Sequence, residues 1–118
     1  MNRIATGARG EQLAAAYLER AGLTVIERNY RCRAGEIDLV ATDGAEFVFV
    51  EVRTRRSAAF GSPEESITTR KQRKMAECAF SYLAEHAAHH RPWRVDVVAV
   101  ELHGATPRRI DHYKHALQ

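Results

Sequence analysis

Two short apolar runs of the sequence carry acidic residues where a buried strand normally carries none. The first run is GEIDLV at residues 35–40, and the second is VFVEVR at residues 48–53. Carboxylates are almost never fully buried unless they are paired with a cation or bound to a metal. A chain that folds these runs into a sheet must therefore place positive charge beside them, which constrains both its fold and its function.

A hairpin should join the two runs, because the Asp-Gly dipeptide at residues 43–44 favours a tight turn. Strand side chains alternate between two faces, so Glu36 and Asp38 share a face, as do Glu51 and Arg53. A two-residue turn places Glu36 opposite Glu51, whereas a four-residue loop places Asp38 opposite Glu51. The sequence leaves both lengths open. Either length gathers the four side chains on one face of the hairpin.

This acidic face needs a positive partner, because like charges opposite one another destabilise a sheet. Arg53 supplies one positive charge, and a divalent cation would supply more. Carboxylates without histidine or cysteine favour Mg²⁺ or Mn²⁺ over zinc. We therefore expect Asp38, Glu51 and Glu36 to bind Mg²⁺ or Mn²⁺. The alternative is that these carboxylates only form salt bridges with nearby arginines; three of them on one face favour the metal site.

Helical periodicity occurs in two parts of the chain. A helix is expected over residues 6–21, with Gly22 as its C-terminal stop. A longer helix is expected to begin at Ser62, which forms a capping box with Glu65. The buried face of this second helix should carry small and apolar side chains at helical spacing: Ala76, Ala79, Phe80, Leu83 and Ala87.

Strands are expected over residues 23–33 and 93–102, with a weaker strand or helical turn over 108–117. The order α-β-β-β-α-β, with a further strand at the end, predicts an α/β fold in which helices flank a mixed β-sheet. A chain of 118 residues is large enough for one such domain over residues 1–118. Inside the 93–102 strand, Asp96 shares a face with Arg94, which predicts an ion pair.

Composition excludes several classes of protein. No apolar run approaches the ~20 residues that cross a bilayer, and the N-terminus lacks a signal-peptide core, so we expect a cytoplasmic protein that does not bind membranes. Cys32 and Cys78 fit neither a disulfide framework nor a zinc spacing and are expected to be reduced. The six histidines show no ligand spacing. A net charge of +3 suits a polyanionic partner.

Residues 35–40 and 49–53 resemble the PD-(D/E)xK signature of restriction-endonuclease-like nucleases. Other segments resemble the small YraN-like bacterial family, which lies near archaeal Holliday-junction resolvases by fold: Gly10-Glu11, Arg28-Asn29-Tyr30, Phe60-Gly61, Lys71 and RVDVV at 94–98. The resemblance covers nearly the whole chain. It implies an endonuclease-like domain that hydrolyses phosphodiester bonds with a bound metal, with branched DNA among the expected substrates.

The resemblance also implies a role for each matching residue. Asp38 and Glu51 match the two metal-binding acidic positions, and Glu11 matches the helical glutamate of resolvase-like members. Glu36 is an additional carboxylate beside the motif. Arg53 departs from the pattern, because that position is usually lysine. Arginine stays protonated and cannot act as a general base, so Arg53 is expected to stabilise charge on the scissile phosphate.

The place of the missing lysine has two candidates on the second helix, Lys71 and Lys74. The alternative is that both belong to a solvated basic helix face together with Arg70 and Arg73. The sequence leaves this choice open, and with it the question of whether the protein turns over a substrate.

Basic residues gather around the hairpin and are expected to contact phosphates that flank the site: Arg31, Arg33, Arg55, Arg56 and Lys74. The leading hypothesis is therefore a metal-dependent, endonuclease-like protein that binds nucleic acid, with DNA favoured over RNA. The resolvase-like relatives further suggest a homodimer. Two alternatives stay open: a non-catalytic nucleic-acid-binding module on the same fold, and a scaffold whose acidic cluster binds protein partners.

Overall fold

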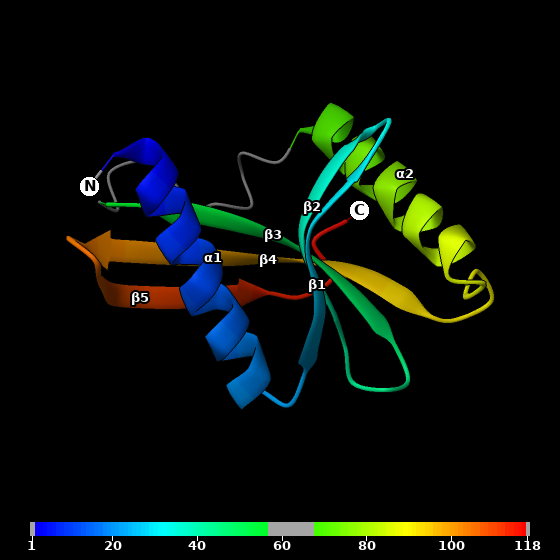
Figure 1. Ribbon diagram of the computed structural model, residues 1–118, viewed down its shortest axis with the longest axis horizontal. Coiled ribbons are helices and arrows are strands. Elements are labelled where there is room, and N and C mark those ends of the chain that lie inside the picture. Colours follow the sequence, from blue (N-terminus) through cyan, green and yellow to red (C-terminus); the bar gives the residue numbers. More distant parts are fainter. Residues whose placement is uncertain (1, 57–67, 118) are drawn as a thin grey trace.

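The structure, a computed structural model, describes residues 2–56 and 68–117. Its elements follow the predicted order (Figure 1). They are helix α1 (Arg3–Arg20), strands β1 (Thr24–Cys32), β2 (Gly35–Thr42) and β3 (Phe47–Arg55), helix α2 (Thr69–Glu85), and strands β4 (Trp93–His103) and β5 (Thr106–Tyr113). The α/β fold class and the mixed sheet flanked by helices are confirmed.

The five strands form one sheet in the order β1-β2-β3-β4-β5. Neighbouring strands are antiparallel except β3 and β4, which pair in parallel from Phe47↔Trp93 to Arg55↔Glu101. A parallel pair requires a crossover connection, usually helical, and α2 lies in that connection. Strands β3 and β4 therefore form the longest paired part of the sheet, and the β1–β2 hairpin extends from one side of it.

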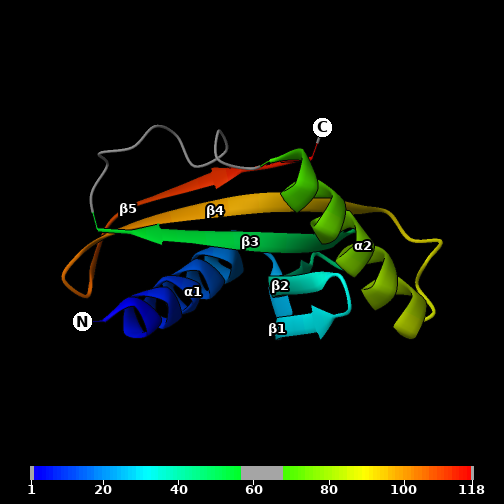
Figure 2. The ribbon, with the colours of Figure 1, turned by 90° about the horizontal axis from the view of Figure 1, so that it is seen from above.

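The two helices cover opposite faces of this sheet (Figure 2). Strand β3 shows the division, because its side chains alternate between the faces. Phe47 and Phe49 pack into the core under α2, whereas Val48 and Val50 pack with Leu18 and its neighbours under α1. A strand buried on both faces reads as a continuous apolar run, which explains the composition of this segment.

Helix α1 begins earlier than the sequence indicated, because Asn2 caps it. The Asn2 side chain accepts a hydrogen bond from the Ala5 amide at 2.8 Å, which satisfies one of the free N–H groups of the first turn. The helix ends at Arg20, and Gly22 follows with φ of +96°. The predicted stop at Gly22 is therefore confirmed.

Helix α2 begins at Thr69, and Thr68 caps it by accepting from the Lys71 amide at 3.1 Å. The capping box expected at Ser62 and Glu65 lies outside the described residues. Within the two described ranges, neither helix is long and apolar enough to cross a membrane.

The buried face of α2 is only partly the predicted one. Ala79 and Leu83 are buried as expected. Phe80 is 58% exposed and meets the Trp93 ring at the margin of the core, and Ala87 follows the helix end with φ of +51°. Both were wrongly expected to be buried. The core-facing positions are instead Met75, Cys78, Ala79, Tyr82 and Leu83.

Candidate functional site

The β2–β3 hairpin places the acidic residues where the two strands separate. Its register runs from Thr42↔Phe47 to Leu39↔Val50, which leaves a four-residue loop at 43–46. Of the two loop lengths left open by the sequence, the longer is therefore observed. Past Leu39↔Val50 the described pairing stops, and the carboxylate of Asp38 accepts the Val52 amide at 2.7 Å.

This break in the pairing changes which way Asp38 faces. Asp38 borders a cavity of about 480 Å³, together with Glu11 of α1 and Val52 and Thr54 of β3. Glu51 instead contacts Lys71 of α2, the helix that covers the opposite face of the sheet from α1, although its negative charge still acts on Asp38. The expectation that all the polar side chains share one face is therefore wrong, because Asp38 leaves the regular alternation to bond the free amide of β3.

Three other carboxylates nonetheless lie within electrostatic reach of Asp38, and we call Glu11, Glu36, Asp38 and Glu51 the carboxylate cluster. Burial raises the pKa of Asp38 to about 7, and the negative charges of Glu51, Glu11 and Glu36 act in the same direction. The hydrogen bond from Val52 opposes this rise. The metal-free protein therefore holds Asp38 at the edge of ionisation near neutral pH, as expected for a carboxylate that lacks a cation.

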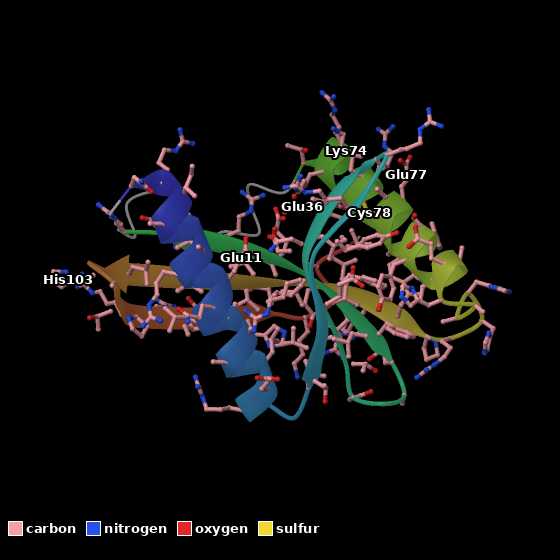
Figure 3. The ribbon with its side chains drawn as sticks, viewed as in Figure 1. Glu11, Glu36, Lys74, Glu77, Cys78 and His103 are labelled. Atoms are coloured by element: carbon pink, nitrogen blue, oxygen red, sulfur yellow. The ribbon has the colours of Figure 1, made fainter. Side chains whose placement is uncertain are left out.

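Asn29 joins two members of the cluster. Its amide nitrogen, turned toward the carboxylates, lies 3.2 Å from Glu11 Oε1 and 3.2 Å from Glu36 Oε1. Burial and the charge of Glu36 raise the pKa of Glu11, while Arg28 and Asn29 lower it. Figure 3 shows Glu11 on α1 and Glu36 on β2, either side of the space between helix and hairpin.

Sequence reasoning assigned no role to Asn29. The available signal was an asparagine interrupting a strand pattern, because asparagine tolerates the left-handed backbone region better than most residues. Asn29 has φ of +53°. From this position its side-chain amide lies between Glu11 and Glu36.

Two cations flank Glu51, which is only 8% exposed. Arg53 Nε lies 3.2 Å from Glu51 Oε2, and Lys71 Nζ lies 3.4 Å from Glu51 Oε1. The Arg53 Nε is buried without satisfying the geometry of a hydrogen bond among the described residues. Of the two lysines that the sequence left open, Lys71 is the one that reaches the cluster.

Gly10 explains how α1 brings Glu11 this close. A Cβ atom at Gly10 would overlap the Thr54 hydroxyl and lie 2.8 Å from the Thr54 Cβ. Only glycine therefore allows the first half of α1 to pack directly on the end of β3. The next residue is Glu11, which is held beside the cavity.

The five basic residues expected to contact nucleic acid fall in different places. Arg31 pairs with the cluster, its Nε 3.2 Å from a Glu36 oxygen, and Arg56 borders the 480 Å³ cavity. Arg33 and Lys74 line a second cavity between the β1–β2 turn and α2. Arg55 ends β3, in register with β4.

The metal ligands expected from the sequence are Asp38, Glu51 and Glu36. In the described part of the chain, no three His, Cys, Asp or Glu side chains converge as a ready-made metal site. Mg²⁺, however, is usually held by one or two carboxylates together with waters and substrate phosphates. The oxygen donors of Asp38 and Glu51 suit that mode of binding, and the raised pKa of Asp38 indicates a need for positive charge. The full set of Asp38, Glu51 and Glu36 remains a prediction.

A second buried polar network surrounds Asp96, whose side chain is fully buried. Its carboxylate accepts from Arg94 Nε at 3.0 Å and from the His115 amide at 3.1 Å, and it lies 2.7 Å from His112 Nε2. Burial alone would raise the pKa of Asp96, but the bonds from His112 and Arg94 hold it below its usual value. The predicted pairing with Arg94 is confirmed. The part played by His112, which also lies 3.2 Å from the Tyr17 hydroxyl, was not anticipated.

Comparison with known proteins places this chain in a family. Residues 10–100 match the model described as "Uncharacterised protein family UPF0102". The chain belongs to this family. The UPF0102 protein of Beutenbergia cavernae is 51% identical over 110 residues, covering 93% of each chain. The UPF0102 protein of Geobacter sulfurreducens is 45% identical, covering 95% of this chain and 88% of the relative.

The UPF0102 protein of Rhodococcus opacus is 46% identical over 98% of both chains. The YraN-like resemblance seen in the sequence is therefore confirmed at the level of the family. Among solved structures, the chain is similar to Pyrococcus furiosus SfsA in complex with Ca²⁺, with a TM-score of 0.43 and 11% identity. That match covers 99% of this chain and 65% of the SfsA chain.

Proposed function

We propose that this UPF0102 protein hydrolyses phosphodiester bonds in nucleic acid with the help of Mg²⁺ or Mn²⁺. The observation that carries the proposal is the carboxylate cluster, which gathers beside Arg53 and Lys71 at the point where β2 and β3 separate. Acidic residues that shift one another's pKa beside fixed cations are typical of catalytic sites. The resemblance of 35–40 and 49–53 to the PD-(D/E)xK signature supports the same chemistry.

Asp38 borders the cavity beside α1 and Glu51 contacts α2, but the charge of Glu51 still acts on Asp38 at the point where β2 and β3 separate. Asp38 and Glu51 would therefore hold the metal ion at that point, with Glu36 and Glu11 adding negative charge around it. When bound, such an ion lowers the pKa of a coordinated water and offsets the repulsion among the carboxylates. In the hydrolysis, a water oxygen bonds to phosphorus and the bond from phosphorus to the leaving ribose oxygen breaks. One proton leaves the attacking water and one joins the leaving oxygen.

The chain's own cations stabilise the charge that builds on the phosphate. Lys71 Nζ and Arg53 Nε are each within 3.4 Å of Glu51. They are therefore held beside the carboxylate that would bind the metal, and they do not need to reorganise when a phosphate binds there. Lys71 thereby occupies, from α2, the role that the nuclease signature gives to a lysine on the strand. Arg53 would orient the phosphate and offset its negative charge, but it cannot accept a proton.

The test is cleavage of labelled linear duplex, single-stranded and four-way-junction DNA, and of RNA, in Mg²⁺ or Mn²⁺. Asp38→Asn and Glu51→Gln should abolish cleavage while leaving the fold intact. Lys71→Met should lower the rate by about 10²-fold or more, the usual loss when one charge-stabilising donor is removed. Lys114→Met is the matched control, because it removes an exposed lysine that follows β5 and does not line the cavity of the candidate site. Undiminished cleavage in both carboxylate variants would refute the assignment.

A non-catalytic nucleic-acid-binding module is the second candidate, and the arginine at position 53 favours it. A module of this kind binds DNA or RNA but leaves it intact in either metal. Arg53→Lys distinguishes the two candidates, because a gain of cleavage from an inert parent supports the binding module. Failure to bind any nucleic acid even at low salt would instead support the protein-binding scaffold.

A further inference from the structure

A second cavity, of about 520 Å³, lies between the β1–β2 turn and the first turns of α2. We call it the basic groove, and it is lined by Arg33, Ala34, Arg70, Arg73, Lys74 and Glu77. Four of these six residues are cations and one is an anion. Figure 3 shows Lys74 and Glu77 at the end of α2 that approaches the hairpin turn. The groove is thus a concentrated positive surface built by two separate elements.

The cations of the basic groove differ from those that pair with carboxylates elsewhere in the structure. Arg31, Arg53 and Arg94 each lie beside a carboxylate. Within the described residues, the four groove cations form no ion pair. Arg70 and Lys74 are one helical turn apart, where like charges repel, and the first turn of α2 contains no acidic residue. This concentration of positive charge therefore costs stability that a bound anion would restore.

Two cysteines bring the elements that form the groove into contact. Cys32 ends β1 next to Arg33, and Cys78 follows Glu77 on α2. The two cysteines are free thiols whose Sγ atoms lie 2.7 Å apart, and Cys78 is fully buried. This contact packs the hairpin turn against the helix below the groove.

The basic groove also adjoins the candidate active site. Its hairpin wall continues directly into Glu36, a member of the carboxylate cluster. Its helical wall also carries Lys71, whose Nζ reaches Glu51. A strand whose scissile phosphate lies at the cluster would therefore extend its neighbouring phosphates toward the groove.

We propose that the basic groove binds backbone phosphates of the nucleic-acid strand beside the bond to be cut, without reading the sequence. This inference rests on the proposed function, because it assumes that the cluster receives a nucleic acid. Guanidinium groups match phosphate oxygens in a bidentate manner. Among the residues that line the groove, none is aromatic, so the described lining offers no platform for stacking bases. The groove therefore contributes affinity and register, and its contribution depends on salt.

The test is fluorescence anisotropy with a labelled duplex and with the same single strand, using Asp38→Asn protein so that the probe stays intact. The groove variant carries Arg33→Gln and Arg73→Gln, and the matched control carries Arg20→Gln and Lys114→Gln, two exposed cations outside the cavities. The groove variant should reduce the slope of log affinity against log salt by about 1.8 for duplex or about 1.4 for single strand, since each contact contributes about 0.9 or 0.7.

The loss should be equal for probes of unrelated sequence, and the control pair should bind as the parent does. The groove variant should also unfold at the same or higher urea concentration than the parent, because a charge repulsion has been removed. An unchanged salt slope, or a loss confined to one probe sequence, would overturn the proposal.

Hydrolysis of thymidine 5′-(p-nitrophenyl phosphate), which is too short to extend into the groove, separates this proposal from the proposed function. If the ester is cleaved in an Asp38-dependent way while the groove variant binds DNA normally, only the groove proposal fails. If the groove variant loses binding but neither the ester nor DNA is cleaved, the groove stands and the nuclease proposal fails.

Discussion

Replacing Asp38 with asparagine should stabilise the metal-free protein at neutral and alkaline pH. The substitution keeps the shape of the side chain and an oxygen that accepts the Val52 amide, the bond that Asp38 makes at 2.7 Å. It removes a charge that burial and three neighbouring carboxylates disfavour. The Asp38 carboxylate, which suits a bound metal ion, therefore destabilises the folded protein when no metal is bound.

The size of the effect follows from the pKa. The carboxyl titrates near its ordinary 3.8 in the unfolded chain and at about 7 in the folded protein. Because the folded pKa is the higher one, the stability that Asp38 allows is fully present below about pH 4 and is lost as the pH rises through 7. A shift of about 3 units corresponds to about 4 kcal/mol at pH 8 and to under about 2 kcal/mol at pH 5.

Urea unfolding of parent and Asp38→Asn at pH 5 and pH 8 measures this difference. With slopes of about 1–3 kcal/mol per molar urea for small proteins, the midpoint of the variant should exceed that of the parent by more than about 1 M at pH 8. The gap should be less than half as large at pH 5. Glu19→Gln, which changes an exposed carboxylate on α1, is the control and should show no such dependence.

Added metal should stabilise the parent but not the Asp38→Asn variant. Mg²⁺ at 100 times its dissociation constant should stabilise the parent by about 2.7 kcal/mol at pH 8 and should leave Asp38→Asn nearly unchanged. Equal urea midpoints for the two metal-free proteins at pH 8 would refute the view that Asp38 is a strained carboxylate. A variant less stable than the parent at every pH would show that Asp38 serves the fold alone.

Two further predictions concern stability. Asp96→Asn should lower the free energy of unfolding by about 3–5 kcal/mol, because it removes the buried carboxylate that pairs with the Arg94 guanidinium. Asp111→Asn, in a pair with the exposed Arg109, should behave like the parent in the same urea titration. Gly10→Ala should cost about 1–3 kcal/mol through overpacking against Thr54. Gly7→Ala, where a Cβ meets nothing within 4 Å, should leave the melting temperature unchanged or raise it, and a lowered value there would contradict the role of packing.

The hairpin shows how far the sequence could determine the site. The Asp-Gly dipeptide correctly located the turn, but the loop length depends on side-chain bonds that a dipeptide preference does not encode. Asp43 Oδ1 accepts from the amides of Ala45 and Glu46, both at 2.9 Å, and the Thr42 hydroxyl donates to the Glu46 carbonyl. These bonds close the longer loop and so select the register that runs from Thr42↔Phe47 to Leu39↔Val50.

The remaining features of the site depend on tertiary packing. Periodicity predicted α2 but could not show that Lys71, rather than Lys74, reaches Glu51, because that depends on how the helix is set against the sheet. The convergence of Glu11 and Glu36 on Asn29 requires a left-handed backbone at one residue and a close helix approach at another. Local sequence preferences specify neither. The carboxylates themselves were predictable, since a charge inside an apolar strand is costly unless a cation or a metal ion lies beside it.

The candidate site depends on both helices, and this has a consequence for how the protein matures. Glu11 needs α1 seated on its core and Lys71 needs α2 seated on the other, so no half of the molecule assembles the complete set. A chain still emerging from the ribosome displays its acidic strands before the lysine-bearing helix exists. Any nuclease activity would therefore appear only when the last helix packs on the sheet. It would be lost when either helix detaches, before the rest of the fold unfolds.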